Sequence, residues 1–123
     1  MQKLINLTPH NLNLHLENGR MIEVAKKDTV IENLPRITVC YEPETRIFEI
    51  DGEAVEIPYN RPVYGEPINY PQATWDCVYV VSRLFISGCV ANHLPVYHLC
   101  SPGSAVRDDN GRVIGSLGLS PAE

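Results

Sequence analysis

The chain has 123 residues, 44% of them hydrophobic and 20% charged, so it is long enough to bury a core as a single domain over residues 1–123. Its formal net charge of −5 argues against binding along the phosphate backbone of long DNA or RNA. No stretch approaches the roughly 18 apolar residues of a membrane span, and the N-terminus lacks the features of a signal peptide. We therefore expect a protein of the cytoplasm that is not held in a membrane.

The N-terminal segment predicts short strands joined by a tight turn. Residues 3–7 alternate between apolar and polar side chains, and residues 11–16 do so strictly, which places Leu12, Leu14 and Leu16 on one face. Asn18-Gly19 is typical of a two-residue hairpin turn, so residues 21–24 are expected to form the return strand.

The next segment has the pattern of an antiparallel meander. Residues 37–41 form a β-branched and aromatic run, residues 46–50 alternate, and Asp51-Gly52 predicts a tight turn into residues 53–57. We interpret residues 37–57 as three consecutive antiparallel strands.

Residues 58–75 differ in composition from the segments before them. Prolines recur every four or five residues and block regular helix and central strand, and aromatic residues stand between them. Flexible linkers are not rich in aromatic residues, so we expect an ordered loop that contains Arg61. Two interpretations of the aromatic residues stay open: they cap the sheet, or they contact a ligand.

A buried strand followed by the principal helix is predicted next. Residues 77–82 are a short β-branched run, and Ser82 is a suitable N-cap for a helix over residues 83–92. That helix is expected to end at Asn92-His93, before Pro95. We expect its apolar face to contain Leu84, Phe85, Cys89 and Val90, with Gly88 allowing close packing.

The C-terminal segment predicts a last strand and a hairpin. Residues 96–100 are expected to form a short strand or an extended piece, and residues 101–103 a turn. Asn110-Gly111 predicts the tight turn of a hairpin over residues 105–115. The whole pattern indicates an α+β fold, mostly antiparallel β with hairpins and a meander, and one principal helix.

The spacing of the cysteine, histidine and aspartate residues gives little support for a catalytic site or a metal site. The four cysteines contain no Cys-x-x-Cys pair, and the four histidines supply no short ligand pair, so we predict reduced, buried thiols and no metal site. Asp108-Asp109 could act as paired carboxylates, but aspartate is favoured at hairpin turns for conformational reasons alone. We therefore expect neither an enzyme nor a cofactor.

Ligand binding has better support, from side chains suited to a nucleotide. Arg107 and Arg112 flank the closing turn and could hold phosphates through forked hydrogen bonds. Asn92 could recognise an adenine edge, and an aromatic ring could stack on the base. The residues that we select are Arg107, Arg112, Asn92, Phe85 and Arg61, with Tyr64, Tyr70 and Trp75 as other candidates for stacking. The alternative is that Arg107 pairs with Asp109 or Asp108 and that Arg112 is merely exposed to solvent.

Three motifs resemble a set of small phage and bacterial proteins. They are Asn6-Leu7-Thr8-Pro9-His10 near the start, Val80-Val81-Ser82, and the hairpin from Val106 to Gly115. In this order they are similar to the Thoeris anti-defence family, first type. That resemblance implies a phage protein that acts in the cytoplasm of the host. It would sequester cyclic ADP-ribose isomers, and in some members cyclic trinucleotides, without cleaving them.

The resemblance also implies roles for individual residues and an assembly. Arg107 and Arg112 match the hairpin arginines that hold phosphates, Asn92 matches a polar residue near the base, and Arg61 a loop arginine of another pocket. Phe85 is our choice for the stacking ring, and a homo-oligomer, dimer or hexamer, is implied. A different hypothesis is a protein-binding inhibitor of a bacterial defence complex, similar to an anti-CRISPR protein. Its acidic surface would come from the stretch between Glu42 and Glu56.

Overall fold

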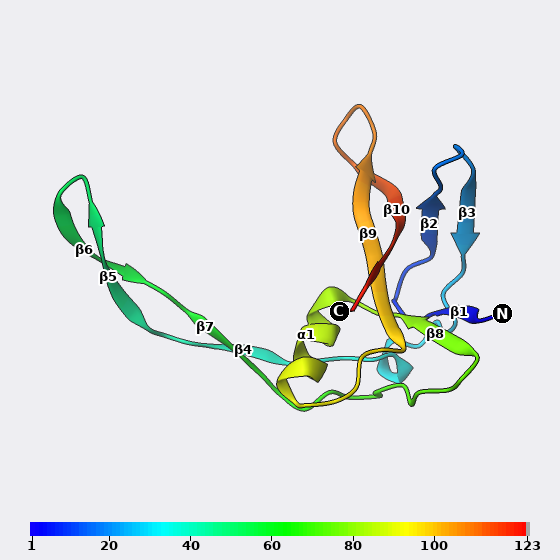
Figure 1. The fold of residues 1–123 in the computed structure, drawn as a ribbon, viewed down its shortest axis with the longest axis horizontal. Coiled ribbons are helices and arrows are strands. Elements are labelled where there is room, and N and C mark those ends of the chain that lie inside the picture. The colour runs from blue at the N-terminus through cyan, green and yellow to red at the C-terminus, as the bar shows by residue number, and fades with distance from the viewer. Residues whose placement is uncertain (123) are drawn as a thin grey trace.

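The computed structural model describes residues 1–122, which form ten strands and one α-helix and so confirm the α+β class. Figure 1 shows a body, which holds the helix and a six-stranded sheet, and a long arm that projects from it. In this part of the chain, no helix is both long and apolar enough to cross a membrane.

The sheet of the body has the strand order β1-β8-β9-β10-β2-β3. These strands are β1 (Lys3–Asn6), β2 (Leu12–His15), β3 (Met21–Val24), β8 (Cys77–Val80), β9 (Leu99–Arg107) and β10 (Val113–Pro121). Three of its five pairings are parallel, namely β1–β8, β8–β9 and β10–β2. Antiparallel pairings predominate, as predicted, only when the two pairs of the arm are included, with four antiparallel pairings against three parallel ones.

The expected N-terminal hairpin is present. β2 and β3 pair antiparallel around Gly19, whose φ of +83° is the left-handed conformation that the tight turn requires. Leu12 and Leu14 are buried and pack with Val80 and Cys100, while Leu16 packs partly against the same cluster. The alternation in the sequence therefore identified the buried face correctly.

A buried asparagine fastens the edge strand β1 to the other side of the sheet. Asn6 is 1% exposed; its Nδ2 donates to the carbonyls of His10 (2.7 Å) and Val24 (3.0 Å). Its Oδ1 accepts from the amide (2.9 Å) and the hydroxyl (2.6 Å) of Thr8. Lys27 N also donates to Asn6 O, so the chain after β3 returns to β1 and the sheet curls towards closure.

The helix α1 (Arg83–Ala91) begins as predicted, because Ser82 Oγ accepts from Phe85 N at 3.1 Å. Its buried residues are Phe85, Ile86, Gly88 and Cys89. The prediction that Leu84 and Val90 share this face is wrong, since both are about half exposed. At Gly88 a Cβ would lie 2.5 Å from Ile37 Cδ1, so the glycine lets the helix approach the segment that leads into the arm.

The arm comprises residues 39–64 and is a single long antiparallel ribbon. β5 (Thr45–Ile50) pairs with β6 (Glu53–Pro58) around the turn Asp51-Gly52, and β4 (Val39–Glu42) pairs with β7 (Arg61–Tyr64). The predicted three-stranded meander is therefore wrong. The chain at Pro43 continues in its direction instead of reversing, so the expected third partner of β5 is absent from the described residues and β4 pairs with the returning strand.

Two further expectations are corrected. Residues 61–64 of the proline-rich segment form a strand, because both strands of a two-stranded ribbon are edges, where a proline such as Pro62 is tolerated. Residues 101–103 form no turn, because β9 continues through them. Its neighbour β8 ends at Val80, so beyond Cys100 this strand has β10 as its partner and leaves one edge free for Pro102.

The rest of the proline-rich segment is ordered by contacts with residues 95–98. Tyr70 Oη donates to Pro95 O at 2.6 Å, and His98 Nε2 donates to Pro71 O at 2.7 Å. His98 is buried and the rings of Tyr70, Tyr79 and Tyr97 meet it edge to face. A short 3₁₀ turn, η1 (Ile31–Asn33), lies near this segment, since Asn69 Nδ2 donates to Glu32 O at 2.7 Å. The loop is therefore anchored, as expected of a segment rich in aromatic residues.

Candidate functional site

The two hairpin arginines lie at the end of β9 and the start of β10, and the local turn engages both. Arg107 Nη1 donates to Gly111 O at 2.8 Å, and Arg112 Nε lies 3.5 Å from Asp108 Oδ2. Asp108 Oδ1 also accepts from the amides of Asn110 and Arg112, each at 2.9 Å. Both guanidinium groups remain exposed and can take a further anion. The alternative stated above is wrong in its assignment, since Arg112 lies beside Asp108 whereas Arg107 contacts a backbone carbonyl.

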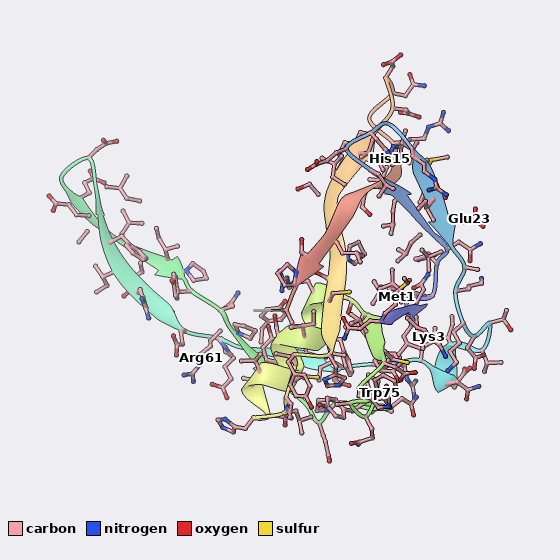
Figure 2. All side chains as sticks on the ribbon, turned by 45° about the vertical axis from the view of Figure 1, so that its right-hand side comes forward. Met1, Lys3, His15, Glu23, Arg61 and Trp75 are labelled. Carbon is pink, nitrogen blue, oxygen red and sulfur yellow. The ribbon has the colours of Figure 1, made fainter. Side chains whose placement is uncertain are left out.

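Arg61 lies on the arm, at its root (Figure 2), and not beside the hairpin arginines. Its Nη2 donates to Glu42 Oε2 at 2.7 Å, and its Nε lies 3.8 Å from Glu44 Oε1. The hydrogen bond to Glu42 and the charges of both carboxylates raise the pKa of the guanidinium. Two acids already balance its charge, so Arg61 is poorly suited to hold a phosphate.

Phe85 requires a correction. It is 1% exposed and belongs to the core that α1 forms with Val81, Val96 and Leu99. A ring that is packed on all sides offers no face to a nucleotide base. The stacking role predicted for Phe85 is therefore incompatible with the fold, and its contribution is to the hydrophobic core.

Asn92 and Tyr70, which the sequence analysis selected separately, meet in one hollow. This hollow has a volume of about 370 Å³ and is lined by Glu66, Pro67, Tyr70, Asn92 and Leu94. Asn92 Nδ2 donates to Gly88 O (2.7 Å) and Gly65 O (3.0 Å), which fixes the amide at the end of α1. Within residues 1–122 its Oδ1 accepts no hydrogen bond, so the carbonyl of the amide is free to accept from a ligand.

Sequence reasoning missed Glu66 and Leu94 as lining residues. Glu66 follows the end of the arm and Leu94 follows the end of α1, so two turns distant in the sequence bring them together. Pro67 and Pro95 mark both turns and were the available signal. The spacing of the residues does not predict that these two turns lie side by side.

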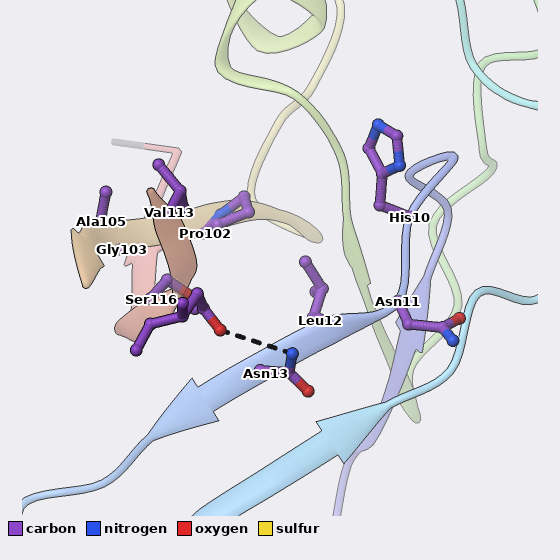
Figure 3. Close-up of a pocket in the computed structure, with 11 residues that line it drawn as sticks. His10, Asn11, Leu12, Asn13, Pro102, Gly103, Ala105, Val113 and Ser116 are labelled. Carbon is purple, nitrogen blue, oxygen red and sulfur yellow. Dashed lines mark hydrogen bonds between the residues drawn. The ribbon is translucent and has the colours of Figure 1, made fainter. Parts of the chain in front are cut away.

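A second hollow, of about 440 Å³, lies against β2, β9 and β10 (Figure 3). Its polar lining comes from the loop before β2 and from β2 itself, with His10, Asn11 and Asn13, whose Nδ2 donates to Ile114 O at 3.4 Å. Small and apolar residues complete it: Leu12, Pro102, Gly103, Ala105, Val113, Ile114, Gly115 and Ser116. No arginine or lysine in the described part of the chain lines either hollow, so neither supplies a phosphate site by itself.

The thiols differ in burial more than predicted. Cys89 and Cys100 are buried, whereas Cys40 is exposed on the arm and Cys77 is partly exposed. Burial raises the pKa of both Cys89 and Cys100 to about 11, so these thiols are poor nucleophiles near neutral pH. Among residues 1–122, no three His, Cys, Asp or Glu side chains are grouped so that they could hold a metal ion.

Comparison with known proteins gives no relative from which a role could be transferred. No family model, no curated protein and no solved structure matches this chain. The similarity of the three motifs to the Thoeris anti-defence family therefore stays a prediction from the sequence.

Proposed function

We propose that this protein is a phage anti-defence protein that binds and sequesters a cyclic ADP-ribose isomer, or a cyclic oligonucleotide, without cleaving it. It would act in the cytoplasm of the host cell. The observation that carries the proposal is the hollow at the end of α1, where the free carbonyl of Asn92 lies with the ring of Tyr70 and the carboxylate of Glu66. The order of the three motifs in the sequence supports it independently.

The chemistry of this hollow suits an adenine base. Both Asn92 Oδ1 and the Glu66 carboxylate are acceptors, and the exocyclic amino group of adenine is a donor. Pro67, Leu94 and Tyr70 supply apolar and aromatic surface for the ring. Phosphate groups would need cations from elsewhere, and Arg107 and Arg112 are exposed cations in the same chain.

The test is a calorimetric titration with cyclic ADP-ribose isomers and cyclic trinucleotides, followed by heat denaturation and chromatography of the released ligand. Glu66→Gln is the informative variant, because Glu66 is exposed and the substitution replaces a charged acceptor by a neutral one of the same shape. We expect it to weaken binding about tenfold, the equivalent of one charge-assisted hydrogen bond. Glu23→Gln, on β3 and outside both hollows, is the matched control and should bind as the wild type does.

Arg107→Ala separates base recognition from phosphate recognition. Loss of binding in this variant, with binding retained in the control, would support a phosphate site on the closing hairpin. Absence of binding for every cyclic nucleotide in the wild-type protein would overturn the proposal, and recovery of a chemically altered ligand would overturn the sequestering mechanism.

A second candidate is a protein-binding inhibitor of a bacterial defence complex, and the arm is the observation that favours it. The arm carries six acidic and two basic residues, a net charge of −4 out of the −5 of the whole chain. Such a projection could occupy a basic groove of a nucleoprotein. Competition with nucleic acid for a purified defence complex, lost on reversal of Glu49 and Glu53 to lysine, would favour this candidate over the first.

A further inference from the structure

The arm exposes an apolar face that no described part of its own chain covers. The strand register places Phe48 opposite Val55 and Arg46 opposite Ile57, and side chains that face each other across a ladder point to the same side. Phe48, Ile50, Val55 and Ile57 therefore share one face, with Arg46 and Glu53 at its two ends, and we call it the apolar face of the arm. The other face carries Ile47 with Glu49, Ala54 and Glu56.

This arrangement is poorly stable when surrounded by water alone. The arm strands pair only with one another, and a two-stranded ribbon needs a third strand or a packed face to be independently stable. Arg46 lies over the Tyr59 ring, with 4.1 Å from Cζ to the ring centroid, and Phe48 also contacts Tyr59. These contacts stabilise the middle of the arm, where β5 begins and β6 ends. These contacts leave Ile50 46% exposed, near the tip.

The body of the same chain carries a second uncovered apolar surface. Val113 and Ile114 of β10 are each more than two-fifths exposed, and both line the hollow of about 440 Å³. We call these two residues with the hollow the β10 surface. The arm projects away from it in both views of the molecule (Figures 1 and 2), so the arm of one chain does not cover its own β10 surface.

We propose that a second copy of this chain covers both surfaces: each copy lays the apolar face of its arm on the β10 surface of the other. Two unpartnered surfaces on one chain then become a single reciprocal, two-fold symmetric contact. Because the contact occurs twice, each copy contributes both the apolar face of its arm and its β10 surface to the interface.

Electrostatic complementarity favours contact between an arm and the β10 surface over contact between two arms. Two arms placed together would oppose net charges of −4 each, a repulsive arrangement. The β10 surface instead has exposed arginines at its rim, because Val113 pairs with Arg107 and follows Arg112. These arginines are complementary to Asp51 in the turn of the arm and to Glu53, which shares the apolar face with Ile50.

The experiment is sedimentation of the wild-type protein and of two matched variants at the same micromolar concentration, without any nucleotide. Ile50→Lys and Ile47→Lys make the same change on the same strand, but on opposite faces of the arm. We expect the wild type and Ile47→Lys to sediment at twice the mass of one chain, and Ile50→Lys as a single chain. A monomeric wild type, or equal behaviour of the two variants, would overturn the proposal.

A charge exchange and a folding control complete the test. Arg112→Glu should weaken the dimer at least tenfold, and Glu53→Arg in the same chain should restore it. Hydrogen exchange should show the amides of β5 and β6 protected in the wild type and unprotected in Ile50→Lys, with the strands of the body unchanged. Loss of protection in the body strands as well would mean that the substitution unfolds the protein, and the charge exchange would then decide. Since no nucleotide is present, failure here is independent of the function proposed above.

Discussion

At the scale of single residues, Asn6 is a buried polar side chain that joins β1 to the loop before β2 and to β3. It belongs to the first of the three motifs that suggested a family, and its four side-chain hydrogen bonds all lie within the body. The motif Asn6-Leu7-Thr8-Pro9-His10 is thus explained by folding, because it fastens β1 and the loop before β2 to the chain that follows β3. Its presence in a sequence is consistent with a ligand site nearby but does not require one.

We predict that Asn6→Ala lowers the free energy of unfolding by about 3 kcal/mol, because it removes several buried hydrogen bonds and leaves buried groups without a partner. Asn11→Ala is the matched control. Asn11 is exposed, and its Oδ1 accepts one hydrogen bond, from Lys26 N at 2.9 Å, so a loss below about 1 kcal/mol is expected. Urea unfolding measures both. Equal losses in the two variants would contradict the role assigned to Asn6.

At the scale of elements, the contact between α1 and the segment before β4 can be tested through Gly88. Alanine there would gain about 1 kcal/mol from helix propensity, but its Cβ would collide with the side chain of Ile37 at a cost of roughly 1–3 kcal/mol. We expect Gly88→Ala to destabilise the protein by about 1 kcal/mol.

The double variant isolates that collision. With Ile37→Ala in the background, the space beside Gly88 is open and Gly88→Ala should become stabilising, so the two substitutions should couple by more than about 1 kcal/mol in a double-mutant cycle. Thermal unfolding of the four proteins supplies the cycle. Additive effects would show that the side chain of Ile37 moves aside freely.

The elements that local chemistry specifies were predictable, and those that depend on distant partners were not. Asn18-Gly19 and Asp51-Gly52 form their turns because residues with positive φ are required there, and Ser82 caps its helix through its own hydroxyl. Strand β4 pairs with β7, which follows it only after the whole β5–β6 hairpin, and no local pattern encodes that pairing. The same holds for the candidate site: Asn92 and Tyr70 were selected one by one, while their meeting with Glu66 depends on two loops packing together.

At the scale of the whole molecule, the division into a body and an arm separates two kinds of stability. The body has two buried clusters, one under α1 and one around Leu12, Leu14, Val80 and Cys100. The arm has no buried residue of its own, since its side chains are exposed or intermediate throughout. Global unfolding should therefore report on the body, and groups buried there should govern how stability depends on pH.

At high pH, we expect Cys89 and Cys100 to determine how the free energy of unfolding depends on pH. Burial raises the pKa of each thiol from 9.0 to about 11. Between these two pH values the thiols stay protonated in the folded state but ionise in the unfolded chain. The unfolded state then binds fewer protons, and the stability that is complete below pH 9 decreases between pH 9 and pH 11. The loss should reach at most about 2–3 kcal/mol for each thiol.

Urea unfolding at a series of pH values measures this slope. In Cys89→Ala/Cys100→Ala the slope between pH 9 and pH 11 should be shallower than in the wild type, whatever the cost of the lost packing at lower pH. Cys40→Ala is the matched control, since Cys40 is exposed in the fold as it is in the unfolded chain, and its slope should equal that of the wild type. A wild-type slope retained in the double variant would mean that other groups, such as lysines or tyrosines, govern the alkaline transition and that these two thiols are accessible to water in the folded state.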